Sequence, residues 1–272
     1  MATSLRSSTP LLLSLLAALP GLTGCASTAP AREPERPAAR QAARQEAAAG
    51  ESEPYPSTYR PLPSAPVLIT NATVLTAAGD RIEGGSVLMR DGKIAAVGRG
   101  IAPAAGVTVV DASGKWVTPG IIDAHSHLGV YPAPGSAQAH QDGNEITDPV
   151  TAEVWAEHSV WPQDPQFPLA IAGGVTTQQI LPGSANLIGG RSVVLKSVPA
   201  RSVQAMKFPG APHGLKMACG ENPKRVYGGK GRAPSTRMGN MAGYREAFIE
   251  AREYARDWDE YEADKEGDAD PP

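Results

Sequence analysis

The sequence predicts an α/β protein in which a small sheet domain is followed by units of alternating strand and helix. Three observations predict this class. Residues 66–118 contain short segments rich in β-branched residues, and turn residues separate these segments. Strand-like and helix-like segments then alternate from Gly120 onward, as in parallel βα units. From Thr236, apolar and aromatic residues recur at helical spacing.

The first 25 residues predict a lipoprotein signal peptide, which is set aside before the fold is considered. Arg6 provides a positive start, and the apolar run 11–22 is too short to span a membrane as a helix. The run leads into LTGC, which resembles the lipobox of bacterial lipoproteins. In a lipobox a small residue precedes a cysteine that is lipidated and becomes the new N-terminus. We therefore expect Cys25 to carry lipid; an ordinary secretory peptide with a chance cysteine is the alternative.

A lipid anchor at Cys25 predicts an exported protein on the periplasmic side of a membrane. Ala26 resembles the residue found in lipoproteins that are sorted to the outer membrane of Gram-negative bacteria. The second cysteine of the chain, Cys219, then has no disulfide partner. A structural disulfide is therefore not expected.

Composition divides much of the remaining chain into segments of different character. Residues 26–65 are rich in Ala and Pro and contain no Val, Ile or Phe, so they predict a disordered linker. Residues 66–118 predict a small antiparallel sheet, in which Asp91-Gly92 has the residue types of a tight hairpin turn. Residues 257–272 form an acidic tail with eight acidic residues and one lysine. The nearly neutral remainder presents no basic face for nucleic acid.

Residues 119–256 predict the strands and helices that carry the chemistry. A helix is expected from about Asp164 to Ala172, and a long helix begins near Thr236, with Ser235 or Thr236 as its cap. The segment IIDAHSH begins with apolar residues, as a strand buried on both faces should. The predicted strands lie in IIDAHSH, GVTTQQILPG, SVVLKSV and GLKMACGE.

His125 and His127, in the segment IIDAHSH, are the candidate metal ligands. Side chains two residues apart on a strand point to the same side, so two imidazoles at this spacing can reach one metal ion. The ends of strands are also where catalytic groups gather in barrel enzymes. The H-x-H pattern alone is weak evidence, because five histidines can produce it by chance. The other histidines are expected at the surface or in the core, with pocket lining as the alternative: His140, His158 and His213.

The context of this motif resembles the opening of the metal-dependent amidohydrolase superfamily, in its imidazolonepropionase-like branch. The resemblance rests on KWVTPGIIDAHSHLG and on DGKIAAVG, which is similar to the sandwich that precedes the barrel in that family. It covers residues 66–261 and implies a small β-sandwich at 66–118, followed by a (β/α)8 barrel from residue 119. Three later segments resemble an exported bacterial subgroup: HQDGNEITDPVTAEVWAEHSVWPQDPQF, AGGVTTQQILPGSANLIGG and GLKMACGENPKRVYG.

The resemblance implies a hydrolase that cleaves carbon–nitrogen bonds in small amide-type molecules with one or two divalent metal ions, zinc being expected. His125 and His127 match the first two ligands of the family. In the family the cation acidifies a water molecule, which attacks a carbonyl or imine carbon. The next ligand is a carboxylate or a carboxylated lysine. Glu221 is the tentative candidate here, and Lys216 and Lys196 are the alternatives.

The sequence departs from the family pattern after His213. The two later histidines and the final aspartate of the family have no counterpart there, so the catalytic residues stay unknown. The stretch from Gly120 to Pro272 is also shorter than the roughly 250 residues of a complete barrel. We therefore expect an incomplete barrel, the N-terminal portion of such an enzyme, either inactive alone or completed in an oligomer.

Two other functions stay open on the sequence. The chain could be a non-catalytic, membrane-tethered binding lipoprotein that retains the amidohydrolase fold. It could also keep the metal site and catalyse a different reaction, such as deamination or isomerisation.

Overall fold

The computed structural model of the chain describes residues 53–135, 142–263 and 271–272, which fall within one compact unit that begins at Glu53. The predicted signal peptide, the lipidation site at Cys25 and residues 26–52 of the predicted linker lie outside the described residues.

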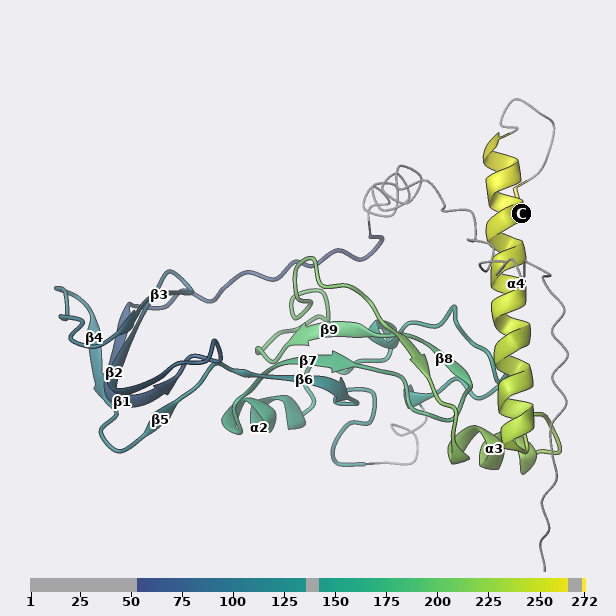
Figure 1. Cartoon of the computed structure of the whole chain (residues 1–272), viewed down its shortest axis with the longest axis horizontal. Helices are drawn as coiled ribbons and strands as arrows, with labels where there is room; N and C mark the ends of the chain where they lie inside the picture. Colours follow the sequence, from purple (N-terminus) through teal and green to yellow (C-terminus); the bar gives the residue numbers. More distant parts are fainter. Residues whose placement is uncertain (1–52, 136–141, 264–270) are drawn as a thin grey trace, which may run out of the picture. The chain divides into compact units, whose positions relative to one another are not determined.

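The first part of this unit is a five-stranded sheet in the order β3-β2-β1-β4, with β5 also paired to β1 (Figure 1). The pairs β1–β2 and β2–β3 are antiparallel, as predicted, whereas β4 and β5 run parallel to β1. The prediction of a purely antiparallel sheet was therefore wrong, because the chain crosses back after β3 and starts β4 beside the start of β1. The strands are β1 (Val67–Leu75), β2 (Arg81–Arg90), β3 (Lys93–Gly98), β4 (Thr108–Asp111) and β5 (Trp116–Val117).

The turn between β2 and β3 confirms the hairpin predicted at Asp91-Gly92. Both residues have positive φ, 54° and 70°, which is the conformation that a two-residue hairpin turn requires and that Asp and Gly tolerate. Local sequence chemistry thus sets the register in which β2 meets β3.

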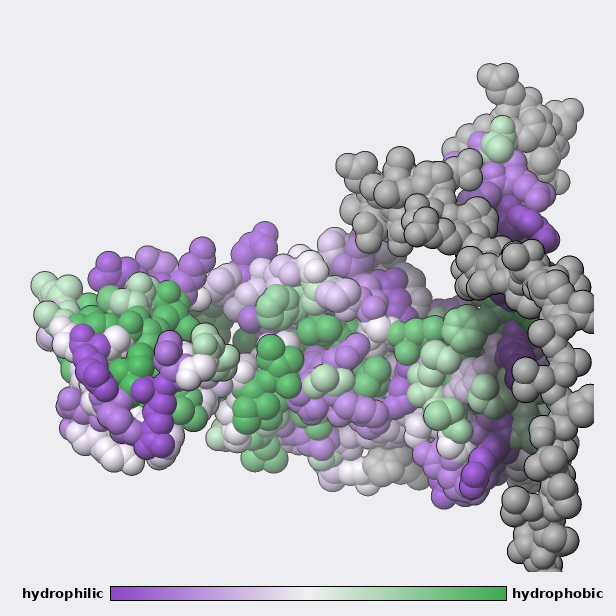
Figure 2. Space-filling view, in the orientation of Figure 1, coloured by the Kyte–Doolittle hydropathy of each residue, from purple (hydrophilic) through white to green (hydrophobic). Residues whose placement is uncertain are grey.

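This first sheet buries one face and exposes much of the other. Its core contains the small and β-branched side chains of Ala72, Val74 and Val87. Trp116 and Ile94 are large apolar residues of the same strands that stay exposed, and Figure 2 shows apolar surface over this part of the molecule. Arg81 lies over the ring of Trp116 at 4.8 Å from its centroid, but no second sheet among the described residues packs on this face, so this region is one layer of sheet.

The second part begins with a strand–helix–strand unit. Strand β6 (Ile121–Ser126) leads through a long loop to helix α2 (Gln166–Ala172), which is followed by β7 (Val175–Ile180). Strands β6 and β7 pair in parallel, as the alternating pattern predicts, and α2 confirms the helix expected up to Ala172. Strand β9 (Val193–Lys196) then adds to the free edge of β7 in the antiparallel direction.

The strands that follow do not continue the predicted series of parallel units. Strand β8 (Ile188–Arg191) pairs antiparallel with β10 (Leu215–Met217) in a separate two-stranded sheet. A parallel crossover needs a dozen or more residues. Because only Ser192 separates β8 from β9, these two consecutive strands cannot form a parallel unit. The sequence pattern identified the strands at β7, β9 and β10 but not the direction in which they pair.

Two helices and a short 3-10 turn complete the described elements. The turn η2 covers Ala156–His158, α3 covers Glu221–Gly228 and α4 covers Arg237–Ala263. Helix α4 confirms the helix predicted from Thr236, whose hydroxyl accepts a hydrogen bond from the amide of Gly239 as an N-cap does. Among the described residues, no helix has the length and apolar character needed to cross a membrane.

The main core lies between α2 and the sheet β6-β7-β9, and it contains Phe167, Ile180 and Leu195. At the opposite end of β6, Ile121 and Ile122 are 53% and 70% exposed. The prediction that this strand is buried on both faces was therefore wrong for the described chain. Strand β6 is an edge strand with β7 as its one neighbour in the sheet, so its outer side lacks cover.

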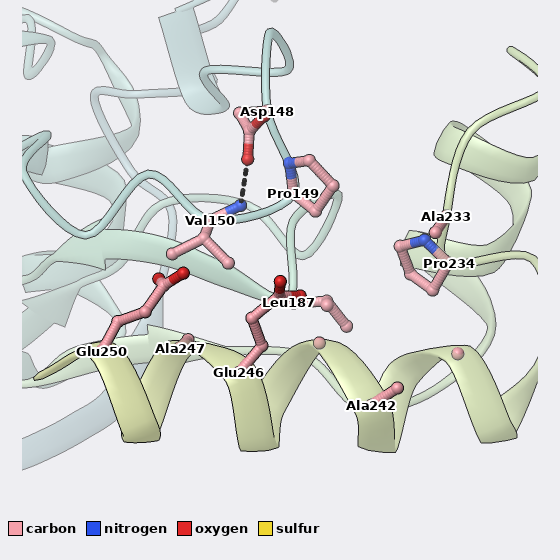
Figure 3. A pocket seen from close by; sticks show the side chains of 12 residues that line it. Asp148, Pro149, Val150, Leu187, Ala233, Pro234, Ala242, Glu246, Ala247 and Glu250 are labelled. Atoms are coloured by element: carbon pink, nitrogen blue, oxygen red, sulfur yellow. Dashed lines mark hydrogen bonds between the residues drawn. The ribbon is translucent and has the colours of Figure 1, made fainter. Parts of the chain in front are cut away.

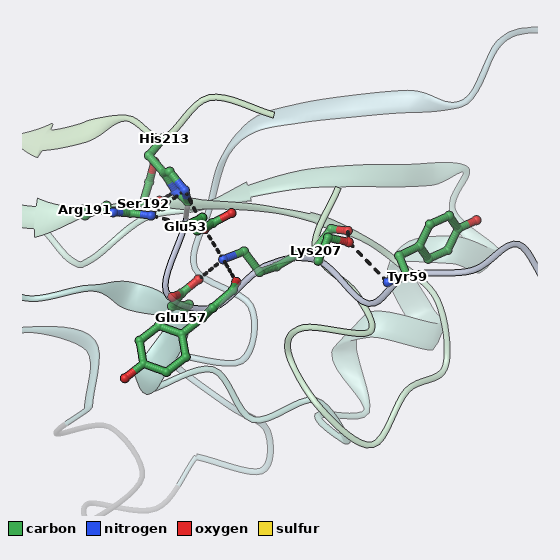
Figure 4. Close-up of polar contacts among 9 residues, drawn as sticks. Glu53, Tyr59, Glu157, Arg191, Ser192, Lys207 and His213 are labelled. Carbon is green, nitrogen blue, oxygen red and sulfur yellow. Dashed lines mark hydrogen bonds and ion pairs between the residues drawn. The ribbon is translucent and has the colours of Figure 1, made fainter. Parts of the chain in front are cut away.

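A buried lysine attaches the end of the predicted linker to this second part (Figure 4). Lys207 is 3% exposed, and its ammonium group contacts the carboxylates of Glu157 and Glu53 and the carbonyl oxygen of Tyr55. The hydroxyl of Ser57 donates to the carbonyl of Lys207 in addition. Residues 53–65, which the sequence placed in a disordered linker, therefore begin with a segment that is docked on the folded unit.

Replacing Lys207 by methionine should lower the free energy of unfolding by about 3–5 kcal/mol, because it leaves the carboxylate of Glu157 buried without its cation. Urea denaturation of the purified chain measures this change. The double variant Lys207→Met/Glu157→Gln should recover much of the loss. Lys224→Met is the matched control, since its partner Glu221 is exposed and the change should stay within about 0.5 kcal/mol. Equal losses in both lysine variants would contradict the assignment.

The carboxylate of Glu53 should make stability depend on acid. Burial raises its pKa, but the hydrogen bonds and charges of Lys207 and His213 outweigh burial and hold the pKa below its usual 4.5. A lowered carboxyl pKa stabilises the fold above pH 4.5, and that contribution is lost as the pH falls through the folded-state value. The stability gap between the parent and Glu53→Gln, measured by urea denaturation, should therefore close on acidification, and a gap that does not change with pH would contradict this role.

Candidate metal centre

The two predicted ligands lie together at the C-terminal end of β6. The ring centroids of His125 and His127 are 5.2 Å apart and the ring planes stand at 86°, so the two imidazoles meet edge to face. His125 is exposed and His127 is partly buried. The spacing argument from the sequence thus agrees with the geometry of the pair.

A backbone carbonyl orients the inner histidine. His127 Nδ1 lies 2.8 Å from the carbonyl oxygen of Leu181, the residue that follows β7. A carbonyl can only accept, so Nδ1 carries the proton and Nε2 is left with its lone pair. Metal-binding histidines are commonly held in this way, because the bond to the second nitrogen fixes both tautomer and ring orientation.

The surroundings keep His127 in its neutral form. Burial lowers the pKa of the imidazole, and the nearby cation of Lys216 adds to the effect, although the Leu181 carbonyl acts in the opposite direction. A neutral imidazole is the form that binds a metal ion.

The outer histidine sits on an irregularity in β6. Asp123 pairs with Gln178 of β7 and Ser126 pairs with Ile180, so three steps along β6 match two along β7. This is a β-bulge, which turns a side chain away from the regular alternation. The amide of His125 bonds to Asp123 Oδ1 at 3.0 Å instead of joining the ladder. Asp123 therefore stabilises the bulge that presents His125.

Lys216 is the third group that the fold brings to the pair. It lies on β10, 91 residues beyond His125, and its Nζ is 3.2 Å from His125 Nε2. The residue is 7% exposed, and burial lowers the pKa of its amine. Of the three alternatives that the sequence offered for the next ligand, this is the one that contacts a histidine.

The other two alternatives lie in different surroundings. Glu221, the tentative choice, begins α3 with a side chain that is 78% exposed and bonds to Lys224 at 2.8 Å. The ammonium group of Lys196 lies over the rings of Phe208 and Tyr59, at 4.5 and 5.1 Å from their centroids. Sequence reasoning could not show which strand end faces β6, because contacts between distant strands decide it.

The other two described histidines have different neighbours. Within residues 53–135 and 142–263, no group of three His, Cys, Asp or Glu side chains is placed to hold a metal ion. His158 is stacked on Trp155, and His213 bonds to Arg191 and Glu53. His140 lies outside the described residues.

Tyr131 is a site residue that sequence reasoning missed. Its ring lies edge to face with His127 at 5.5 Å, and its hydroxyl accepts a hydrogen bond from the side-chain amide of Asn144. Burial raises the pKa of this phenol. The loop that carries it is held by Asp164, a fully buried carboxylate that accepts bonds from the amides of Gly129 and Ala133. No motif marks Tyr131, since only this loop conformation brings it to the histidine.

Two of the cavities in this part of the unit bear on the site. A cavity of about 220 Å³ includes Asn144, which bonds to Tyr131, and Pro182, which follows Leu181. Neither histidine lines it, but these links to Tyr131 and Leu181 make it the better candidate for a substrate pocket. A larger cavity of about 390 Å³ lies between α4 and residues 148–150 (Figure 3), and none of the site residues lines it.

Comparison with known proteins finds named amidohydrolases that are similar to this chain. The chain is 40% identical over 162 residues to the amidohydrolase tasK of Hapsidospora irregularis, covering 56% of this chain and 16% of tasK. It is 34% identical over 146 residues to imidazolonepropionase of Chromobacterium violaceum, covering 45% and 35% of the two chains. The solved structure of an amidohydrolase from Thermotoga maritima is 39% identical, with a TM-score of 0.68 over 76% of this chain.

The matched relatives are all longer than the region they share with this chain. The chain spans 52% of the Thermotoga maritima protein and smaller shares of the other two. No family model matches the sequence. These likenesses to named amidohydrolases, together with the α/β architecture, support the metal-dependent amidohydrolase superfamily as the family that this chain resembles.

Proposed function

We propose that the chain carries the first part of the active site of a metal-dependent hydrolase that cleaves carbon–nitrogen bonds in small molecules. The observation that carries this proposal is the convergence of His125, His127 and the buried amine of Lys216 from two separate strands. Named amidohydrolases are similar to this stretch of the chain, which supports the reaction class.

The donor atoms suit a divalent metal ion. Imidazole nitrogens are favoured by zinc and by related divalent ions, and His127 already has its Nε2 free for such a bond. One or two ions, with zinc expected, would be held by His125, His127 and a modified Lys216.

Lys216 would join as a carbamate, as the family resemblance implies. A neutral amine adds carbon dioxide to form a nitrogen–carbon bond and releases one proton, which leaves an anionic carboxylate at the end of the side chain. Burial disfavours the ammonium form of Lys216 and so favours the neutral amine that this reaction needs. An anionic oxygen ligand would offset the charge of the metal.

When bound, the cation would act as a Lewis acid that polarises the substrate carbonyl and acidifies water. The chain supplies the surroundings for that chemistry. The Leu181 carbonyl holds the proton of His127 on Nδ1, and Asp123 holds the backbone at His125. Tyr131 packs against the ring of His127, which is partly buried.

Small-molecule substrates with a carbon–nitrogen bond in or on a ring are the proposed class. Among the relatives are an imidazolonepropionase, 5'-deoxyadenosine deaminases and dihydroorotases. A cavity of about 220 Å³ beside Asn144 is large enough for part of such a ring. Hydrolysis of a ring amide is proposed first, and deamination or isomerisation at the same metal site are its variants.

A non-catalytic, membrane-tethered binding protein is the second candidate. The observation that favours it is that no acidic or further histidine side chain of the described residues joins the pair, so a group that moves protons is not in place. Both candidates keep the proposed lipid anchor at Cys25 and a location on the periplasmic face of an outer membrane.

The proposed architecture is a β-sandwich formed in part by residues 66–118 and the first part of a (β/α)8 barrel in residues 119–256. The parallel pair β6–β7 with α2 between them supports the barrel. The single layer formed by β1–β5 supports half of a sandwich. The acidic segment 257–272 follows as a tail.

Zinc binding and zinc-dependent hydrolysis test the proposal. The parent chain should bind zinc in competition with a chromophoric chelator, and the variant His125→Ala/His127→Ala should lose this binding. His158→Ala is the matched control and should bind like the parent, because its imidazole is stacked on Trp155. Zinc-dependent release of product from a panel of cyclic amides and amidines would support an enzyme. Binding without turnover would favour the second candidate, and equal binding by all variants would refute the site.

The carbamate on Lys216 has its own test. In buffer with ¹³C-labelled bicarbonate and zinc, the parent should show one carbamate carbon signal in its NMR spectrum. Lys216→Met should lack the signal and should bind zinc more weakly, by about 10- to 100-fold for a lost ligand or supporting group. Lys196→Met is the control and should keep both properties, because its ammonium group packs on Phe208. Persistence of the signal in Lys216→Met would contradict the assignment.

A further inference from the structure

We infer that Gln178 is a positioning residue for the two histidines, acting through Ser126. The inference rests on the proposed metal site and concerns a residue that lies behind it. Gln178 is on β7, is 1% exposed and belongs to the core side of the sheet.

The need for such a residue follows from the bulge in β6. Between Asp123 and Ser126 the regular backbone pairing of β6 with β7 is interrupted, and the amide of His125 bonds to the carboxylate of Asp123. A bulge weakens the ladder locally and bends the strand. The two histidines therefore stand on the part of β6 that backbone hydrogen bonds hold least firmly.

A chain of side-chain hydrogen bonds crosses the sheet at this point. Ser126 Oγ donates to Gln178 Oε1 at 2.7 Å, and Gln178 Nε2 donates to Ser197 Oγ at 2.9 Å. All three side chains are buried. The chain of bonds runs from β6 across β7 to the residue that follows β9, and so ties the bulged strand to two neighbours.

Ser126 is the link to the site. It lies between His125 and His127 in the sequence, and its side chain is buried, whereas His125 is exposed and His127 is partly buried. Its hydroxyl also accepts the amide of Leu128 at 3.3 Å, and its carbonyl accepts the amide of Leu181 at 3.0 Å. Fixing Ser126 on the core side therefore fixes the backbone from which both imidazoles project.

Stability alone does not account for an amide at position 178. Its neighbours in this core, Ile180 and Leu195, are apolar and fully buried, and an apolar side chain there would avoid the desolvation of a polar group. The amide of Gln178 fixes the relative position of two segments, because its oxygen bonds to Ser126 and its nitrogen bonds to Ser197 with defined geometry. Metal ligands need this definition, since a displacement of about 0.5 Å already weakens a site.

Zinc affinity and the visible absorption spectrum of the cobalt-substituted protein test the inference on the full chain. Gln178→Met keeps the size of the side chain and removes both hydrogen bonds, and Ser126→Ala removes the link to the site. Both variants should bind zinc about tenfold more weakly and shift the cobalt bands, which report ligand geometry. The double variant should be no weaker than either single variant, and Ser126→Thr, which keeps the hydroxyl, should bind like the parent.

Tyr227→Phe is the matched control. Tyr227 is fully buried, and the change removes one hydrogen bond, from its hydroxyl to the carbonyl of Asp148. It should lower the urea midpoint and leave zinc affinity and the cobalt spectrum unchanged. Unaltered zinc affinity in Gln178→Met, or an equal loss of affinity in Tyr227→Phe, would overturn the inference.

Amide hydrogen exchange in the metal-free protein separates this inference from the proposed function. The amide of Leu181 bonds to Ser126, so its protection should fall at least tenfold in Gln178→Met and stay unchanged in Tyr227→Phe. A parent chain without zinc affinity would refute the proposed function. The exchange rates would then decide the positioning role alone, and equal Leu181 protection in the parent and Gln178→Met would refute it.

Discussion

The parallel pairing of β6 with β7 is the constraint on which the candidate site depends. It places the end of β6 beside Leu181, whose carbonyl sets the tautomer of His127, and beside Gln178, which bonds to Ser126. The pairing is imperfect at His125, where a bulge interrupts the ladder. Bulges are common at functional sites because they redirect a side chain. Hydrogen bonds among the buried polar side chains next to the bulge fix the strand where backbone pairing is interrupted.

Elsewhere in the unit, buried polar side chains hold loops in place by bonding to their backbone. Asp164 accepts the backbone amides of the loop that carries Tyr131, and Asn186 donates to backbone oxygens in the loop that follows Asn144. Lys207 holds the segment that begins at Glu53. Each of these groups is costly to bury unless its partners are present, so each one specifies a single loop conformation.

Apolar side chains that remain exposed show how much of the described unit lacks cover. Ile122 on β6 and Trp116 on β5 belong to strands whose residue types are those of buried sheets, yet both are exposed. The chain spans 52% of the amidohydrolase from Thermotoga maritima, which has further chain beyond the matched region. The described residues therefore contain the candidate histidine pair and the side chains that contact it, but not every layer that such a sheet packs against.

The sequence by itself determined what depends on neighbours along the chain. Local residue types and periodicity account for four features: the Asp91-Gly92 turn, the strands β7 and β9, the helix after Thr236 and the spacing of the histidine pair. Only the tertiary structure decided that Lys216, and not Glu221, meets His125, because they lie 91 residues apart and strand pairing sets their distance. The tertiary structure also decided that β9 pairs antiparallel with β7, that Tyr131 lies beside His127, and that Gln178 bonds to Ser126. These contacts join residues whose separation in sequence carries no periodic signal.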